Sequence, residues 1–215
     1  MANSVLIDSA YSHIRNRIRA GELMPGTLLS ENELAEELNM SRTPIRAAIA
    51  RLEYEGLLAT LKNRGVLVRE VSLKEVMDTL ELLYIFQMQA VAQIEELGEQ
   101  PDLKKLKEHL DRQLEAEREN VYGRYLESSM EFISCFIGIL NNMTISRIVD
   151  ISVEKLALYG TVNYIRTPHE PHYSANAQHR SIYEMLLEKD YDGIRKLTSH
   201  AYQRNRERLL RSARI

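Results

Sequence analysis

Two arginines one helical turn apart, Arg42 and Arg46, are the residues of this sequence best suited to reading another molecule. A guanidinium group donates two parallel hydrogen bonds, a geometry that matches O6 and N7 of guanine in the major groove of DNA. The hydroxyl groups of Ser41 and Thr43 precede and separate these arginines, and they suit phosphate oxygens together with the N–H groups of a helix's first turn. The spacing therefore predicts a helix whose N-terminal end contacts double-stranded DNA. Arg51 lies farther along this helix, and we expect it to contact phosphate only.

The elements that must position these arginines are two short helices in succession. Ser30 to Glu33 is a capping-box pattern that opens the first, and Ser41 is a candidate N-cap for the second. Pro44 falls in the first turn of the second helix, where its missing N–H is tolerated. Gly56 ends that helix. This order is typical of a helix-turn-helix, whose second helix enters the major groove.

A hairpin is predicted directly after the second helix. Residues 57–60 and 66–69 read as two strands joined by a turn over residues 62–65. Gly65 allows a tight turn, and Arg64 lies at its tip, within reach of the DNA backbone or the minor groove. The hairpin is the wing of a winged helix-turn-helix.

The rest of the chain is predicted to be helical. A first helix ends near Ala20, and the domain boundary falls at residues 70–72, which gives an N-terminal domain over 1–70 and an all-α bundle over 71–215. The fold class is therefore mainly α, a winged helix-turn-helix followed by a helical-bundle effector domain. The pattern predicts helices at about 72–98, 101–120, 122–140, 145–164, 175–188 and 191–211.

The charge is sorted along the sequence, although the net charge is only -3. Residues 1–70 hold nine basic and nine acidic residues, with acids before the second short helix and arginines on it, and sorted charge favours DNA docking. No apolar run is long enough to cross a bilayer, and no secretory signal is recognisable. The single cysteine, Cys135, is expected to be a small buried hydrophobe and fits a reducing cytoplasm.

Residues 21–68 resemble the winged-helix domain of GntR-type bacterial transcription regulators, because five motifs agree in order and spacing. The helical remainder resembles the ligand-sensing, FCD-type domain of the FadR-like subgroup, on helix count and on His179, Ile182 and His200. The resemblance implies a repressor or another regulator that binds a palindromic operator as a homodimer. The five motifs are Gly21-Glu22-Leu23 with Pro25-Gly26, Leu29 to Ala35, Ser41 to Arg46, Leu52 with Glu55 to Leu57, and Asn63 to Gly65.

Many members of that subgroup hold a divalent metal with one aspartate and three histidines. Alignment on the family pattern puts Ser129 and Ile133 where an aspartate and a histidine would stand, and leaves His179 and His200. Two imidazoles are a poor set for a first-row metal, so no metal is expected. The alternatives are that Ser129, Asn142, His179 and His200 bind a small-molecule effector, or that the two histidines only join helices.

Two other classes of protein are alternatives to a ligand-responsive regulator. A metal-dependent or hydrolytic enzyme is disfavoured, because the sequence has no P-loop, no His-Glu-x-x-His and no Gly-x-Ser-x-Gly. A protein-interaction module remains the other alternative. Arg42 and Arg46 disfavour it, since a protein-binding winged helix needs no such pair.

Overall fold

The computed structural model describes residues 2–170 and 172–212, and their contacts separate into two units. The first unit comprises Met1–Val71 with Leu158–Arg166, and the second comprises Ser72–Ala157 with Thr167–Ile215. The first unit is a winged helix-turn-helix and the second is entirely helical, so the predicted fold class is confirmed. None of the described helices combines the length and the apolar character that crossing a bilayer requires.

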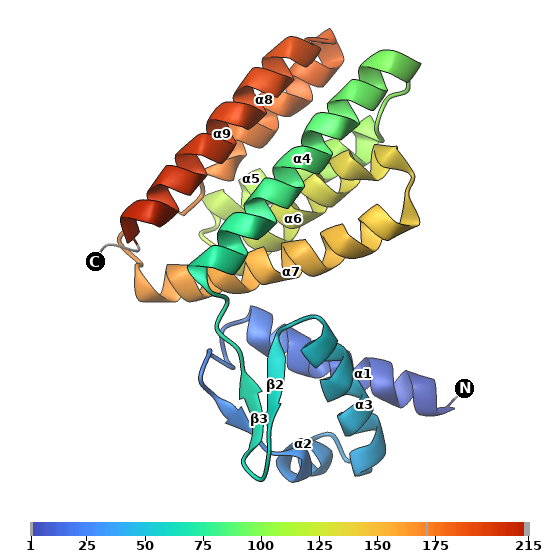
Figure 1. Ribbon diagram of the computed structural model, residues 1–215, viewed down its shortest axis with the longest axis vertical. Coiled ribbons are helices and arrows are strands. Elements are labelled where there is room, and N and C mark those ends of the chain that lie inside the picture. Colours follow the sequence, from blue (N-terminus) through green and yellow to red (C-terminus); the bar gives the residue numbers. More distant parts are fainter. Residues whose placement is uncertain (1, 171, 213–215) are drawn as a thin grey trace. The chain divides into compact units, whose positions relative to one another are not determined.

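Three helices and a small antiparallel sheet form the first unit (Figure 1). The helices are α1 (Ala2–Arg19), α2 (Glu31–Glu37) and α3 (Arg42–Tyr54), and the strands are β1 (Leu28–Leu29), β2 (Leu58–Leu61) and β3 (Gly65–Val68). The apolar faces of α1 and α3 pack against each other. Their fully buried side chains include Ile14, Ile18, Ile45 and Leu52.

The strand β1 is an element that the sequence did not predict, because it has only two residues and no alternating pattern. It adds to the hairpin in the order β1-β3-β2, with Leu29 opposite Val66. Gly65 begins β3 with φ +102°, and a Cβ at this position would lie 2.7 Å from the carbonyl oxygen of Leu29. Only glycine therefore allows both the turn and the close approach of β1.

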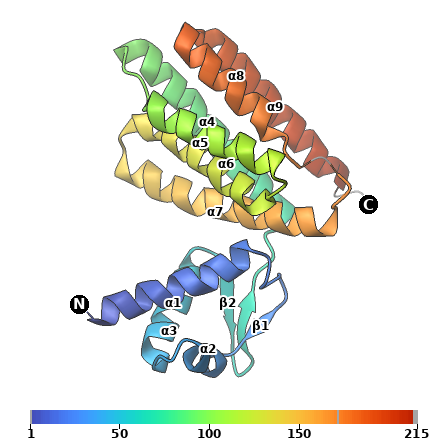
Figure 2. The same ribbon diagram turned by 180° about the vertical axis from the view of Figure 1, so that it is seen from behind.

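The second unit is a bundle of long helices (Figure 2). Its core joins side chains from α4, α5, α6, α8 and α9, among them Ile94, Leu106, Phe132, Ile182 and Ile194. The bounds are α4 (Leu73–Leu97), α5 (Leu103–Arg118), α6 (Tyr122–Ile137), a 3-10 turn (Gly138–Leu140), α7 (Met143–Arg166), α8 (Ala175–Glu188) and α9 (Tyr191–Ser212).

Local capping explains where these helices begin and end. The predicted capping box at Ser72 is complete, since its hydroxyl accepts from Glu75 N at 3.2 Å and Glu75 Oε2 accepts from Ser72 N at 3.1 Å. Gly98 ends α4 with φ +68°. The next helix begins at Leu103 rather than near Pro101, because Asp102 is its N-cap. Cys135 is half-buried rather than buried, a correction to the expectation.

The last turns of α7 belong to the first unit, whereas the sequence assigned the whole of α7 to the helical domain. Thr161 Oγ1 donates a hydrogen bond to the carbonyl oxygen of Arg19 at 3.1 Å, and Arg166 forms an ion pair with Glu70 at 2.6 Å. The side chain of Ile165 lies against Gly21, whose φ is +76°. Such contacts join segments far apart in the chain, so sequence periodicity does not indicate them.

Candidate nucleic-acid interface

A groove of about 600 Å³ lies between the start of α2, the first turns of α3 and the hairpin. Figure 1 shows the tip of the hairpin beside α2. The groove brings together four of the six residues predicted to bind DNA: Arg42 and Arg46 from α3, and Arg64 and Gly65 from the hairpin. Arginines from two separate elements therefore converge on one concave surface.

Arg42 and Arg46 are both held by a single carboxylate oxygen. Glu31 Oε2 accepts from Arg42 Nη2 at 2.9 Å and from Arg46 Nε at 2.7 Å. The two arginine side chains are 54% and 59% exposed, against 25% for Glu31, so the guanidinium groups remain accessible to a ligand. The hydrogen bonds from Arg46 and Arg42 lower the pKa of the Glu31 carboxyl, which keeps it ionised.

Ser41 and Thr43 lie at the start of α3, beside the residues that line the groove. Both are exposed. Ser41 is the N-cap by position, but its hydroxyl makes no capping hydrogen bond, which corrects the expectation that it caps the helix through its side chain. At the start of α2, Ser30 accepts from Glu33 N at 3.4 Å, so one half of the predicted capping box is formed there. The Ser41 hydroxyl is therefore not committed to its own helix.

Arg51 has a structural position rather than a place in the groove. Its guanidinium carbon lies 3.7 Å from the centroid of the Tyr11 ring, and its Nη1 donates to Asp8 at 3.2 Å. The hydroxyl of Tyr11 in turn donates to Glu55 at 2.9 Å, and burial raises the pKa of that hydroxyl to about 12. Arg51 thus joins α3 to α1, and its expected contact with phosphate stays a prediction.

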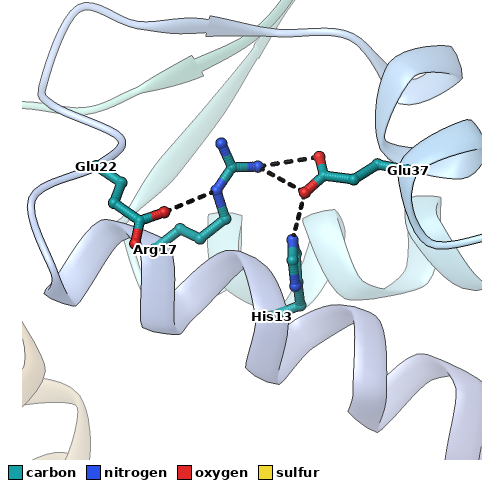
Figure 3. A network of polar contacts seen from close by, with 4 residues as sticks. All are labelled: His13, Arg17, Glu22 and Glu37. Atoms are coloured by element: carbon teal, nitrogen blue, oxygen red, sulfur yellow. Dashed lines mark hydrogen bonds and ion pairs between the residues drawn. The ribbon is translucent and has the colours of Figure 1, made fainter.

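A second ion-pair network fixes α1 against α2 (Figure 3). Arg17 Nη1 donates to both oxygens of Glu37, at 3.1 and 3.0 Å, and its Nε donates to Glu22 at 3.2 Å. His13 Nε2 lies 2.9 Å from Glu37 Oε1. Arg17 and Arg51 therefore join helices, whereas Arg42 and Arg46, the pair on Glu31, face the groove.

In the helical unit, His179 lies in a buried and neutral environment. Its side chain is 2% exposed, and the ring stacks on Phe132 with centroids 4.3 Å apart. Its Nδ1 lies 2.9 Å from Gln113 Oε1, which only accepts, so we assign the ring proton to Nδ1. Burial lowers the pKa of His179 to about 3, which keeps the imidazole uncharged at neutral pH.

The other three residues predicted to bind the effector do not all share that environment. Ser129 is 2% exposed on α6, one turn before Phe132. Asn142 is exposed and caps α7, because its Oδ1 accepts from the N–H groups of Thr144 and Ile145. His200 is exposed on α9, where the next residue, Ala201, is the buried one. Asn142 and His200 are thus placed away from the interior that contains His179.

These residues do not fit the divalent metal that the resemblance implies. Ser129 and Ile133 offer no anionic or imidazole ligand and His200 is on the surface, so His179 is the only buried imidazole of this set. Within residues 2–170 and 172–212, no three His, Cys, Asp or Glu side chains cluster in a way that could hold a metal ion. A first-row metal needs three or four such ligands.

Sequence reasoning missed polar residues in both units. Glu31 was identified only as part of a capping pattern. In the helical unit, Gln113 Nε2, Asn176 Oδ1 and Thr198 Oγ1 are buried without a hydrogen-bond partner among the described residues. A polar residue on the apolar face of an amphipathic helix is the available signal, and Gln113 between Leu110 and Ala116 shows it.

Two family models match this chain, one over the winged helix and one over the helical unit. Residues 6–68 match the family model of bacterial regulatory proteins of the gntR family, and residues 78–204 match the model of the FCD domain. The "HTH-type transcriptional repressor RspR" of Escherichia coli (strain K12) is 25% identical over 193 residues, which cover 88% of this chain and 83% of RspR.

Other similarities are partial or concern the fold. The "Uncharacterized HTH-type transcriptional regulator in the TAR-I ttuE-ttuC' intergenic region" of Agrobacterium vitis is 37% identical over 76 residues, 35% of this chain and 44% of that protein. The match therefore spans less than half of that relative. A transcriptional regulator GntR from Rhodococcus sp. RHA1 superposes with a TM-score of 0.82 at 21% identity, covering 95% of this chain and 96% of that one.

Proposed function

Because this chain belongs to the GntR family of bacterial regulatory proteins, with an FCD domain after its winged helix, we propose that it binds a palindromic DNA operator as a homodimer and that a small molecule in the helical domain changes its affinity. The family consists of transcription regulators and not of enzymes. One winged helix makes few base contacts, so a useful degree of specificity requires two half-sites and two copies of the chain.

The observation that carries this proposal is the convergence of Arg42, Arg46 and Arg64 on one groove. In the proposal, Arg42 and Arg46 donate hydrogen bonds to base edges, and Ser41 and Thr43 contact phosphates. Arg64 is exposed at the hairpin tip and reaches the DNA backbone or minor groove. Gly65 shapes the turn that presents it.

A double substitution tests the assignment of the groove. Arg42→Ala with Arg46→Ala is expected to lower affinity for a palindrome selected by the wild-type protein from a random duplex library by roughly 100-fold or more at fixed salt, since each arginine–guanine pair discriminates by about 1–3 kcal/mol. The matched control is Arg204→Ala with Arg208→Ala, two exposed arginines at the same spacing on α9. If the double variant at α3 keeps its sequence preference, the assignment is wrong.

Arg64→Ala tests whether Arg64 contacts the DNA backbone or reads a base. Because a wing arginine on phosphates carries no sequence information, its loss is expected to weaken binding to the palindrome and to a scrambled duplex by the same factor. The slope of log affinity against log salt should fall by about one. A loss confined to the palindrome would instead assign base reading to Arg64.

The effector part of the proposal is supported by the orphaned polar atoms in the helical unit. A buried polar group without a partner costs about 1–3 kcal/mol, so Gln113 Nε2, Asn176 Oδ1 and Thr198 Oγ1 favour a polar guest. His179 and Ser129 are the buried members of the predicted effector set, and we retain these two. A thermal-shift screen of small polar metabolites, repeated with Gln113→Leu, tests this: a stabilising compound should lose its effect in the variant.

The direction of regulation follows from the relative named a repressor. RspR is similar over most of both chains, and we infer that this chain also represses. Deletion of its gene should raise transcription of the genes next to its binding site, measured by quantitative transcript analysis. A fall in those transcripts would indicate an activator.

A further inference from the structure

Glu31 is a negative charge placed inside a groove that is otherwise suited to DNA. It is the first residue of α2 and lines the groove together with Arg42, Arg46 and the hairpin tip. One of its oxygens, Oε2, accepts from both arginines, at 2.9 and 2.7 Å. A carboxylate in this position repels phosphate, so affinity for DNA does not explain why it is there.

The stability of the fold does not explain the position of Glu31 either. The arginines are more than half exposed, and exposed ion pairs contribute little to stability. α2 has its own N-cap in Ser30, whose hydroxyl accepts from Glu33 N. The contact of Glu31 therefore acts on the arginines rather than on the helix to which it belongs.

The donor atoms that Glu31 uses indicate what it does to each arginine. A guanidinium has a side edge, formed by Nε and one terminal nitrogen, and an end edge, formed by Nη1 and Nη2. Glu31 binds Arg46 through Nε, and neither terminal nitrogen takes part in that hydrogen bond. The end edge of Arg46 is therefore free to pair with O6 and N7 of guanine. Arg42 is bound through Nη2, so part of its own end edge is occupied.

We propose that Glu31 is a specificity-determining positioning residue: it orients Arg46 by its Nε so that Nη1 and Nη2 address a base, and it disfavours DNA held through phosphate contacts alone. The proposal rests on the proposed function. Specificity is a difference between two affinities, and a charge that penalises non-specific complexes increases that difference as effectively as a new contact does. An arginine fixed before binding also loses less conformational freedom when it meets the base.

Three variants separate the two parts of this role. Glu31→Gln removes the charge and keeps the length, Glu31→Asp keeps the charge and shortens the reach, and Glu33→Gln is the control. Glu33 lines the same groove and is exposed, and no hydrogen bond or ion pair joins its carboxylate to Arg42 or Arg46 in the described part of the chain. The readouts are the affinities for the palindrome selected by the wild-type protein and for a scrambled duplex, with thermal unfolding to check the fold.

For Glu31→Gln, we expect affinity for the scrambled duplex to rise by about threefold to tenfold and the ratio of the two affinities to fall by about tenfold. For Glu31→Asp, the scrambled duplex should bind as in wild type while the palindrome binds more weakly. Glu33→Gln should change both affinities by the same factor and leave the ratio unaltered.

Equal changes for both duplexes in Glu31→Gln would overturn the proposal, because Glu31 would then be a general electrostatic mask. An unchanged ratio in both Glu31 variants would overturn it as well. These outcomes leave the proposed function intact, since the wild-type protein still selects a palindrome. Failure of the wild-type protein to enrich any duplex would contradict the proposed function itself, and the role of Glu31 with it.

Discussion

The groove of the winged helix and the interior of the helical unit differ in the charge and burial of their polar groups. In the groove, Arg42, Arg46 and Glu31 are charged, partly exposed and joined by ion pairs. In the helical unit, His179 and Gln113 are buried, neutral and joined by one hydrogen bond. An exposed ion pair exchanges its partner at small desolvation cost, whereas a buried neutral pair depends on its protonation state. The groove is therefore suited to a polyanion and should respond to salt, and the interior is suited to a neutral polar group and should respond to pH.

The largest expected effect lies in the backbone that shapes the groove. Gly65→Ala should lower the stability of the winged-helix unit by about 3 kcal/mol, because φ is +102° and a Cβ would lie 2.7 Å from the backbone oxygen of Leu29. Gly26→Ala is the control: its φ is +92°, but nothing lies within 4 Å of an added Cβ, so about 1 kcal/mol is expected. Hydrogen exchange of the β3 amides measures the difference, and equal protection in both variants would contradict it.

The pH response of the helical unit tests the neutral state of His179. Its pKa is about 3 in the folded chain and about 6.5 when unfolded, so the unfolded chain binds more protons between these values. The stability that neutral His179 provides is complete above pH 6.5 and decreases as pH falls. By pH 5 the loss is about 2 kcal/mol.

The measurement compares the wild-type protein with His179→Gln. The difference in free energy of unfolding between them should shrink from pH 7 to pH 5, because the variant has no imidazole to protonate. His200→Gln removes an exposed imidazole from α9 and is the matched control. If the two variants show the same pH dependence, His179 is not the group responsible.

Two serines at the starts of helices, Ser72 and Ser41, allow a test with a smaller expected effect. Ser72 caps α4 through its hydroxyl, so Ser72→Ala should lower the free energy of unfolding by about 1 kcal/mol and leave DNA affinity unchanged. Ser41 makes no capping hydrogen bond, so Ser41→Ala should leave stability almost unchanged and weaken DNA binding several-fold. Chemical denaturation and duplex titration on both variants test this. A stability loss at Ser41 equal to that at Ser72 would remove the argument for a phosphate contact.

The contrast also explains how much of each site the sequence predicts. The groove is built from local motifs: Pro44 within the first turn, Gly56 after the helix and Gly65 in the turn fix α3 and the hairpin, and the arginines follow from their spacing. The sequence did not predict β1, nor the contact of Glu31 with the arginines. That contact spans 11 and 15 residues along the chain to the two arginines, which no helical periodicity encodes.

The helical interior depends on which side of each helix faces inward, and the sequence leaves that open. His200 and Ala201 are adjacent, yet the first is exposed and the second buried. The pairing of Gln113 with His179 joins residues 66 positions apart. The sequence groups Asn142 with the residues expected to bind the effector, whereas its side chain caps α7.

The smallest expected effect concerns metal ions, where the helical unit should show no response. Addition of Zn²⁺ or of a chelator should leave the unfolding temperature of the wild-type protein unchanged, because a ligand stabilises a fold only where the native state binds it. Restoring ligands provides the positive control. Ser129→Asp with Ile133→His restores on α6 the acid and the imidazole that the family pattern has at these two positions, and this variant should gain stability with Zn²⁺. Stabilisation of the wild-type protein by Zn²⁺ that is lost in His179→Gln would show that Nε2 of His179 binds metal, and the contrast between a charged groove and a neutral interior would then fail.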